Sequence, residues 1–303
     1  MEKILFIVNP ISGSGNGKKF YDHFLKNLKK SYNIEIILTK ERDHATKICL
    51  EMCCKYSKII ICGGDGTFNE AINGIPSDSE CAIGLIPIGS GNDFMKNFIQ
   101  TTDYNFYLDS LSKNTFMTHK VDIGEIEINH CHSPEVVKRK FINSCGIGFD
   151  AYVAYLNQNS KKIKGKLSYI YSIIMGLVKS KAIQFTGFFD SLPKEGNKLF
   201  ISIGNGKTAG GGLFLTPYAE VKDGLLDFTL VDNISMFKLI RKLPLAIKNK
   251  LHLLHEVEFG TFKSASLKLE NPYFVHVDGE SISNCASEIK ISICEHKLNF
   301  ITL

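Results

Sequence analysis

Short apolar runs and amphipathic stretches alternate along the first third of the chain. The run Ile4–Val8 is continuous rather than alternating, which is typical of a strand buried on both faces of a sheet. We predict strands there and at Ile34–Leu38, 59–62 and 83–86. Amphipathic patterning predicts helices at 18–30, at a segment that Asp43 is suited to cap, and at 68–75. This order predicts a parallel sheet covered by helices, with right-handed crossovers.

Beyond residue 115 the pattern changes to short apolar segments separated by Gly, Pro, Asn or Asp turns. Such segments predict the strands of a mainly antiparallel β-domain. The predicted strands are 121–128, 140–144, Ile183–Phe189, 198–203, 225–231, 266–269, 274–277 and 288–294. Two helical stretches interrupt them, near 163–179 and 236–252.

The composition is that of an ordinary globular chain of about two domains, with 303 residues of which 44% are hydrophobic and 22% charged. The formal net charge of +5 allows an anionic partner, such as nucleotide phosphate or an acidic membrane face. It is too small to argue for nucleic acid, and the sequence contains no zinc finger or RNP motif. We therefore expect no nucleic-acid partner.

The apolar stretches and the cysteines indicate the cellular compartment in which the protein is expected. No stretch reaches the roughly 18 apolar residues of a membrane span, and we see no secretory signal. The nine cysteines lie mostly inside apolar runs and lack zinc-like spacing, which fits a reducing compartment. His130-Cys131-His132 is interpreted as a loop or hairpin tip. We expect a cytoplasmic protein that meets the inner face of a membrane transiently.

Three glycine-rich turns, at 9–17, 63–67 and 87–93, follow three successive strand candidates. In open α/β sheets, ligands bind at the carboxyl ends of the strands. Three such turns at one edge predict a phosphate-binding rim, because glycine lets backbone N–H groups approach an anion closely. Taken singly, each turn is equally well explained as punctuation between a strand and a helix.

Asp65 is the unusual residue of the second turn, because a carboxylate suits phosphate binding only when a cation lies between them. It predicts either a Mg²⁺ bridge to a triphosphate or proton abstraction. The sequence contains no G-x-x-x-x-G-K-[ST] motif and no G-x-G-x-x-G after the first strand. Walker and Rossmann nucleotide sites are therefore disfavoured.

The second turn and its continuation, Gly63-Gly64-Asp65-Gly66-Thr67-Phe68-Asn69-Glu70, resemble the GGDGT-x-NE signature of the diacylglycerol kinase catalytic domain family. That family includes eukaryotic diacylglycerol and sphingosine kinases and soluble bacterial lipid kinases. Further family motifs are matched in order at 9–13, 87–94, 146–151, 204–206, 210–212, 223–227 and 277–280. The ordered series spans nearly the whole chain and is far more specific than GGDGT alone.

The resemblance implies an α/β plus all-β architecture. Residues 1–120 are expected to form a nucleotide-binding α/β domain with a parallel sheet, similar to NAD kinases and phosphofructokinases. Residues 121–294 are expected to form an antiparallel β-sandwich that takes the lipid substrate. The last strand of this family returns to the first domain, so 295–303 is assigned there, with 298–303 as the strand. The resemblance also implies that ATP lies in the cleft between the domains.

Site residues follow from the resemblance position by position. The residues expected to bind ATP are Asn9, Ser12, Gly13, Thr39, Gly63, Gly64, Asp65, Gly66, Thr67, Phe68, Asn69, Ser90, Asn92 and Asp93. Ser90 replaces the Thr that is usual in the family. Glu280 matches the proton acceptor, with Asp278 as the alternative, and both also fit a plain hairpin turn.

The resemblance also implies that carboxylates bind cations at two places. Asp65 is the third catalytic candidate, and its expected role is to anchor Mg²⁺ or the nucleotide. Glu220, Asp223 and the Leu225 carbonyl match a structural Mg²⁺ site, although an Asp-Gly turn without metal also explains that segment.

Phosphoryl transfer then predicts an ATP- and Mg²⁺-dependent kinase of a membrane lipid, with diacylglycerol giving phosphatidic acid as the leading reaction. A kinase of a soluble acceptor such as NAD and a catalytically silent nucleotide- or lipid-binding regulator stay open as alternatives. Lysine-rich 161–181 is a candidate interfacial helix on an anionic membrane, or else a core helix. The cluster of Arg241, Lys242, Lys248 and Lys250 is interpreted as a solvated face, and a homodimer is allowed for.

Overall fold

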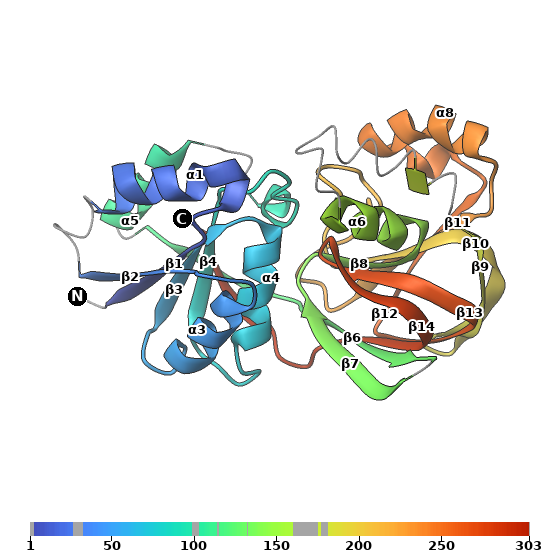
Figure 1. Ribbon diagram of the computed structural model, residues 1–303, viewed down its shortest axis with the longest axis horizontal. Coiled ribbons are helices and arrows are strands. Elements are labelled where there is room, and N and C mark those ends of the chain that lie inside the picture. The colour runs from blue at the N-terminus through green and yellow to red at the C-terminus, as the bar shows by residue number, and fades with distance from the viewer. Residues whose placement is uncertain are drawn as a thin grey trace. The chain divides into compact units, whose positions relative to one another are not determined.

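The computed structural model describes residues 3–26, 33–98, 103–113, 115–131, 133–159, 175–176 and 181–302. The chain folds into two compact units (Figure 1). One unit contains Met1–Asp122 together with Glu295–Leu303, and the other contains Ile123–Cys294. Each unit has its own sheet and its own hydrophobic core. No helix among the residues described is long and apolar enough to cross a membrane.

A six-stranded sheet in the order β2-β1-β3-β4-β15-β5 forms the first unit. Its strands are β1 (Ile4–Val8), β2 (Ile34–Leu38), β3 (Lys58–Gly63), β4 (Ala82–Pro87), β5 (Met117–Val121) and β15 (Leu298–Thr302). The first four strands and β15 run parallel, and β5 runs antiparallel to β15. The continuous apolar runs are explained by burial on both sheet faces. Strand β15 lies in this sheet, as the resemblance implied.

Helices connect these strands on both faces of the sheet (Figure 1). They are α1 (Ser12–Phe20), the π-helical turn η1 (Tyr21–Leu25), α3 (His44–Met52), α4 (Asp65–Gly74), the 3₁₀ turn η2 (Phe94–Asn97) and α5 (Tyr104–Lys113). The register pairs Val8 with both Leu38 and Cys62, and Cys62 with Ile86. The carboxyl ends of β1 to β4 therefore finish at one edge of the sheet.

Helix α3 begins after Asp43, as predicted, but the prediction that Asp43 caps it is wrong. Asp43 has a left-handed φ of 59°, and its side chain makes no capping hydrogen bond. Glu70 of α4 instead accepts a hydrogen bond from the Ala45 N–H at 3.3 Å and so serves this helix end from outside. Close packing makes this possible, because a Cβ at Gly74 would lie only 2.1 Å from the Thr46 carbonyl oxygen.

The second unit is a nine-stranded antiparallel sheet. Its strands are β6 (Gly124–His130), β7 (Ser133–Phe141), β8 (Ser144–Gly148), β9 (Ile183–Phe189), β10 (Leu192–Gly204), β11 (Leu226–Asp232), β12 (Val257–Phe262), β13 (Ser264–Val277) and β14 (Glu280–Ile293). Strands β8 and β9 each pair with both β10 and β13, so the sheet closes on itself. The enclosed core includes Phe141, Ile147, Phe185 and Phe228.

Helical segments lie outside these strands: α6 (Phe149–Asn159), α8 (Met236–Ile247) and the 3₁₀ turn η3 (Leu251–Leu253) (Figure 1). The pattern near 236–252 predicted α8 and η3, whereas α6 was not predicted. The helix predicted near 163–179 lies outside the described residues, apart from Met175 and Gly176, which are helical.

Some predicted strands have the wrong limits. The segment 121–128 spans the end of β5 and the start of β6, and it therefore passes from one unit to the other. The segment 140–144 contains the turn between β7 and β8, whereas 266–269 and 274–277 are parts of the single strand β13. Hydrophobic periodicity misses both breaks because Ile123 and Ile142, the residues at the breaks, are themselves buried.

Candidate functional site

The three glycine-rich turns of the first unit meet at the carboxyl edge of its sheet. A Cβ at Gly13 would lie 2.1 Å from the Ile88 carbonyl oxygen, and one at Gly89 would lie 2.5 Å from the Gly64 Cα. Backbone therefore packs directly on backbone, which only glycine permits. We call the turns 9–17, 63–67 and 87–93 together the glycine rim.

Asn9 joins the first turn of the rim to the second. Its Nδ2 donates to Thr67 Oγ1 at 2.8 Å, and its Oδ1 accepts the Ile11 N–H at 3.1 Å. Beyond it, residues 13–15 all have positive φ, including Ser14 at 59°. A side chain in that conformation is uncommon and persists only where the surroundings impose it. The regular part of α1 therefore starts after a left-handed turn.

Asp65 is the first residue of α4, where the helix dipole favours a carboxylate. Its Oδ1 accepts the Phe94 N–H at 3.2 Å and so ties the second turn to the third. Gly64, at the cap position, has no side chain with which to cover the first N–H groups of α4. A Cβ at Gly66 would meet no atom within 4 Å. This helix start is thus open to an anion.

Asn92 organises the third turn of the rim. It has a φ of 50°, and its Nδ2 donates to the Gly89 carbonyl oxygen at 2.8 Å. Its Oδ1 is buried and has no hydrogen-bond partner among the residues described, so this acceptor is left for an ordered water. The neighbouring Asp93 is buried and pairs with Lys96 at 2.6 Å, while Ser90 is exposed.

Three other residues expected at the nucleotide lie at or beneath the rim. Phe68 is fully buried, and its ring stacks on Phe94 with 5.2 Å between centroids, so its side chain supports the rim from below. Asn69 is buried and its Oδ1 accepts from Asn73 Nδ2 at 3.1 Å. Thr39 follows β2 at the same edge, where its N–H donates to the Val8 carbonyl oxygen at 2.9 Å.

In the second unit, Asp278 and Gly279 form the two-residue turn between β13 and β14. Their φ angles of 45° and 80° are those of a tight hairpin turn. The Asp278 carboxylate accepts the N–H groups of Ile142 (3.1 Å), Asn143 (3.0 Å) and Ser144 (2.7 Å). These bonds stabilise its charged form and use three of the roughly four acceptor positions of the carboxylate. The arrangement favours a structural role for Asp278.

Asp190, in the turn between β9 and β10, makes the same kind of hydrogen bonds to backbone N–H groups. It has a φ of 50°, and its Oδ1 accepts the N–H groups of Lys263 at 3.0 Å and Ser264 at 2.9 Å. A hairpin aspartate that binds the backbone of a neighbouring segment is thus an architectural element of this unit. The repetition favours a structural role for Asp278.

Glu280 begins β14, and its side chain is 21% exposed. Arg139 of β7 places its Nη2 3.4 Å from Glu280 Oε2. The sequence does not single out Arg139, because only the pairing of the sheet brings it to this carboxylate. Both acids of the turn are partly exposed, and they differ in their partners, backbone N–H groups for Asp278 and a side chain, Arg139, for Glu280.

A buried pair that the sequence did not reveal supports the turn from beneath. The Gly279 N–H donates to His276 Nδ1 at 3.3 Å, so the neutral ring carries its proton on Nε2. That nitrogen lies 3.4 Å from Asp150 Oδ2. A Cβ at Gly146 would lie 2.0 Å from the same oxygen, so the pair needs glycine there. Asp150 stands in the matched motif at 146–151, which was the available signal.

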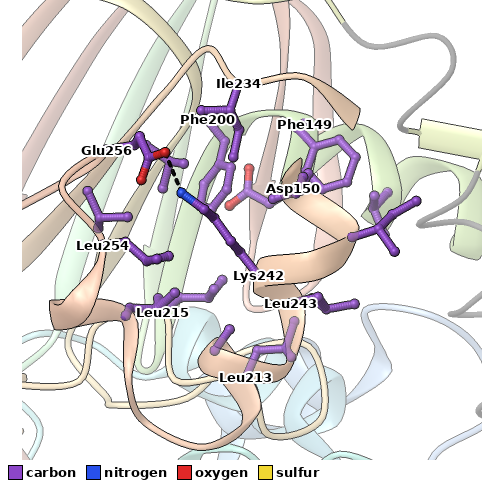
Figure 2. Close-up of a pocket in the computed structure, with 17 residues that line it drawn as sticks. Phe149, Asp150, Phe200, Leu213, Leu215, Ile234, Lys242, Leu243, Leu254 and Glu256 are labelled. Atoms are coloured by element: carbon purple, nitrogen blue, oxygen red, sulfur yellow. Dashed lines mark hydrogen bonds and ion pairs between the residues drawn. The ribbon is translucent and has the colours of Figure 1, made fainter. Parts of the chain in front are cut away.

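Asp150 also lines a cavity between α8 and the sheet of the second unit (Figure 2). Its volume is about 80 Å³, and most of its wall is apolar, including Phe149, Val153, Phe200, Leu213, Leu215, Leu243 and Leu254. Lys242 and Glu256 form an ion pair in this wall. The hydrogen bond from Lys242 lowers the pKa of Glu256. The interpretation of Lys242 as part of a solvated face is therefore wrong.

The candidate metal residues lie on the loop before β11. Lys207 Nζ lies 3.0 Å from Glu220 Oε1, and Asp223 Oδ1 accepts the Leu225 N–H at 3.0 Å. Burial, and then the charges of Asp223 and Glu220, raise the pKa of the nearby Asp227 to about 7. The excess of negative charge and the oxygen donors fit a hard cation such as Mg²⁺.

The fit at this loop is incomplete as the side chains stand. Within the described ranges, no three His, Cys, Asp or Glu side chains are grouped so as to hold a metal ion. The Glu220 side chain is 63% exposed and free to reorient, and a backbone carbonyl and water would have to supply the remaining ligands.

Comparison with known families covers most of the chain. Residues 3–126 match the diacylglycerol kinase catalytic domain, and residues 143–298 match the YegS C-terminal NAD kinase beta sandwich-like domain. The chain belongs to the diacylglycerol kinase-like family of lipid kinases. The glycine rim lies within the first matched region, and the Asp278–Glu280 turn lies within the second.

Relatives of this lipid kinase match along nearly all of its length. A protein named diacylglycerol kinase from Mycobacterium tuberculosis (strain ATCC 25618 / H37Rv) is 25% identical over 95% of this chain and 91% of its own. One of the same name from Staphylococcus saprophyticus is 29% identical over 90% of this chain and 87% of its own. The similarity therefore includes both units.

Solved structures share the fold. A crystal structure of a diacylglycerol kinase from Bacillus anthracis str. Sterne superposes with a TM-score of 0.71 at 21% identity, covering all of this chain and 97% of that one. Yeast NADH kinase superposes with a TM-score of 0.57 at 10% identity, covering all of this chain and 84% of that one. At these identities the likeness shows the fold alone.

Proposed function

We propose that this lipid kinase transfers the γ-phosphoryl group of ATP to the free hydroxyl of diacylglycerol, giving phosphatidic acid. The observation that carries the proposal is Glu280, an accessible carboxylate held by Arg139 on the unit that also contains the apolar cavity. The names of the Mycobacterium and Staphylococcus relatives support this acceptor.

In the first unit, the open N–H groups at the start of α4 would bind the phosphates of ATP. Asn92, whose buried Oδ1 would bind an ordered water, would support the third turn beside the nucleotide. Mg²⁺, when bound to the phosphates, would neutralise charge that develops during transfer, with Asp65 as its anchor. The tie from Asp65 to the Phe94 N–H would keep that carboxylate at a fixed place in the rim.

In the second unit, Glu280 would accept the proton of the lipid hydroxyl as its oxygen attacks the γ-phosphorus. The bond from that phosphorus to the bridging oxygen breaks, and ADP leaves. Arg139 would orient the carboxylate before the reaction. Asp278, and His276 with Asp150 behind it, would hold the turn that carries Glu280.

The apolar cavity suits the hydrocarbon part of the acceptor. At about 80 Å³ it holds only a small part of an acyl chain, so we expect α8 to move outward when lipid binds. A soluble acceptor such as NAD has no comparable need for an apolar wall. The apolar lining therefore favours a lipid acceptor over a nucleotide.

The proposal is tested by incubating the protein with [γ-³²P]ATP and mixed micelles that contain diacylglycerol, monoacylglycerol or a sphingoid base, and separately with NAD. We expect labelled phosphatidic acid to be the main product. Labelling of NAD, or of a lipid other than diacylglycerol, would contradict the acceptor assignment.

A matched variant separates turnover from binding. Asp65→Asn keeps an oxygen to accept the Phe94 N–H but removes the negative charge. It should fold, as judged by an unchanged melting temperature, and lose at least about a hundredfold in kcat. A wild-type protein that binds ATP and phosphorylates none of these acceptors would instead be a silent regulator.

A further inference from the structure

Helix α8 has a second apolar face, which points away from the cavity. Phe237, Ile240 and Ile247 are 71%, 51% and 56% exposed. Together with the exposed Pro244 they are spaced by three, four and three residues, which places them on one side of the helix. Ile240 lies at the border of this side, because it also lines the cavity. Leu239 and Ala246, on the opposite side from Phe237, line the cavity as well. The helix is therefore apolar on both faces, and the side chains of the outer face are exposed.

Cations lie beside this outer face. Lys238 and Arg241 are exposed on α8, and the Arg241 guanidinium lies 5.8 Å from the centre of the Phe237 ring. Lys248 and Lys250 follow the helix and are exposed. Among the described residues, the carboxylate of Glu256 is paired with Lys242 of α8 at the cavity. The charged side chains that α8 itself contributes are all basic.

The segment that contains α8 carries a local excess of positive charge. Residues 233–255 contain five Lys and Arg residues and no Asp or Glu. Lysine-rich 161–181, with six Lys and no Asp or Glu, is a second such segment. An anionic partner is therefore attracted to α8 as one of the basic regions of the chain.

We propose that the outer face of α8 docks on an anionic phospholipid surface, with Phe237 and Ile247 inserted among the lipids and Lys238, Arg241 and Lys248 at the headgroups. An amphipathic helix with large apolar side chains and a basic border is suited to lie in the plane of a bilayer interface. The proposal rests on the lipid kinase assignment for its purpose, because the acceptor is dissolved in a membrane. It assigns docking to α8 and needs no contribution from residues 161–181.

If α8 docks on the membrane, the helix has two functions, one on each face. Its inner face closes the cavity, and the Lys242–Glu256 ion pair holds it closed. Insertion of the outer face into lipid would pull on the same helix. The surface that recruits the protein is therefore also the wall that must move to admit an acyl chain.

A single-tryptophan reporter tests the docking directly, because the chain contains no Trp. Phe237→Trp should shift its emission to shorter wavelength when vesicles containing phosphatidylglycerol are added, and should be quenched by brominated lipid. Phe188→Trp is the control, since Phe188 is exposed on β9, far from α8 in sequence, and should not respond. An unchanged Phe237→Trp spectrum would overturn the proposal.

Co-sedimentation tests the apolar and the basic parts separately. Phe237→Ser with Ile247→Ser should lower vesicle binding at least about tenfold, and the matched pair Phe188→Ser with Leu192→Ser should not. Lys238→Gln with Arg241→Gln and Lys248→Gln should abolish the dependence on phosphatidylglycerol and on salt between about 0.1 M and 0.5 M NaCl. The matched set is Lys263→Gln with Lys268→Gln and Lys290→Gln, all exposed on or beside other strands.

Activity distinguishes failure of this proposal from failure of the proposed function. The Phe237→Ser, Ile247→Ser variant should phosphorylate a short-chain diacylglycerol in solution at the wild-type rate, but diacylglycerol in vesicles at least about tenfold more slowly. Equal rates on vesicles would contradict docking by α8. A variant that changes oligomeric state in gel filtration, with vesicle binding intact, would identify the face as a contact between copies. If the wild type phosphorylates neither substrate, the kinase assignment fails, and the vesicle experiments still decide the docking.

Discussion

The glycine rim and the Asp278–Glu280 turn differ in the groups that they present, which are backbone groups in the rim and side chains in the turn. The rim is made of backbone, with Gly13 against Ile88 and Gly64 against Gly89. The turn is made of side chains, with Asp278 bound to three N–H groups and Glu280 beside Arg139. A rim of amides suits a polyanion, which needs many weak donors at close range, and a turn of acids suits a proton, which needs one well-placed acceptor.

The comparison also distinguishes residues proposed to contact the substrate from residues that stabilise the local structure. In the rim, even Asp65 is partly structural, because it binds the Phe94 N–H. In the turn, we propose that neighbouring acids have different roles, since Asp278 accepts three backbone N–H groups while Glu280 pairs with the Arg139 side chain. The following changes test that division, beginning with the largest expected effect.

Glu280→Gln should lower kcat by about 10²–10⁴, because an amide cannot accept the proton of the lipid hydroxyl. The free energy of unfolding should change by less than about 1 kcal/mol, since the carboxylate is partly exposed. Glu288→Gln, on the same strand and bound to Asn129 at 3.2 Å, is the control. Initial rates and urea midpoints measure both quantities. If Glu280→Gln retains wild-type turnover, Glu280 is not the base.

Asp278→Asn should behave in the opposite way. Asn before Gly suits the tight turn, so the backbone is kept while the charge-assisted bonds to Asn143 and Ser144 weaken. We expect a loss of about 2–3 kcal/mol in the free energy of unfolding, measured by urea titration. Asp190→Asn, at the equivalent but exposed turn, should cost less. A stable Asp278→Asn protein with kcat lowered a hundredfold would show instead that Asp278 takes part in the reaction.

Gly89→Ala should destabilise the first unit by about 1–3 kcal/mol, because the new Cβ would lie 2.5 Å from the Gly64 Cα. Gly66→Ala is the matched change, since a Cβ there meets no atom within 4 Å and Ala favours the helix. Gly66→Ala should therefore fold normally yet raise the KM for ATP, because the methyl group stands where phosphate would approach. Thermal melts with kinetics at varied ATP separate the two effects. An unchanged KM in Gly66→Ala would remove this helix start from the nucleotide site.

Mg²⁺ at the loop before β11, which affects stability rather than turnover, should have the smallest effect. At ten times its Kd it should stabilise the second unit by about 1.4 kcal/mol, because it relieves the repulsion among Glu220, Asp223 and Asp227. Asp223→Asn keeps an oxygen for the Leu225 N–H but removes the charge, so its melting temperature should no longer respond to Mg²⁺. Melts in EDTA and in Mg²⁺, with ATP absent, provide the measurement. An equal response in wild type and variant would place the metal elsewhere.

Much of the first unit could be predicted from the sequence. Strands β1 and β2 were predicted with their observed limits, and β3 and β4 to within a residue at either end. In β1 and β3 burial on both faces leaves a continuous apolar run, whereas the edge strand β2 is only partly buried and contains Glu35. The rim could be predicted because a close approach of two backbones requires glycine at the point of contact itself. The break inside 121–128 could not, since Ile123 is buried at the junction and preserves the apolar pattern.

The second unit shows where prediction from sequence fails. Glu280 could be chosen by its motif, but its partner Arg139 is 141 residues away along the chain and reaches it only through the pairing of β7, β6 and β14. His276 and Asp150 meet in the same way across 126 residues. The outer face of α8 is also invisible in the sequence, because an apolar helix does not reveal which of its sides the core will cover.

The sequence by itself therefore determined the order of β1 to β4 and of the helices between them, the glycine rim and the acids of the Asp278–Glu280 turn, but it missed α5 and the limits of β5. The features that it determined depend on residue type and on near neighbours, so a short stretch of sequence is enough to predict them. Tertiary structure alone decided which acid is bound by backbone N–H groups, that Glu70 rather than Asp43 binds the start of α3, and which face of α8 is exposed. Each of these depends on contacts between segments far apart in the chain, and such contacts exist only after the sheets have formed.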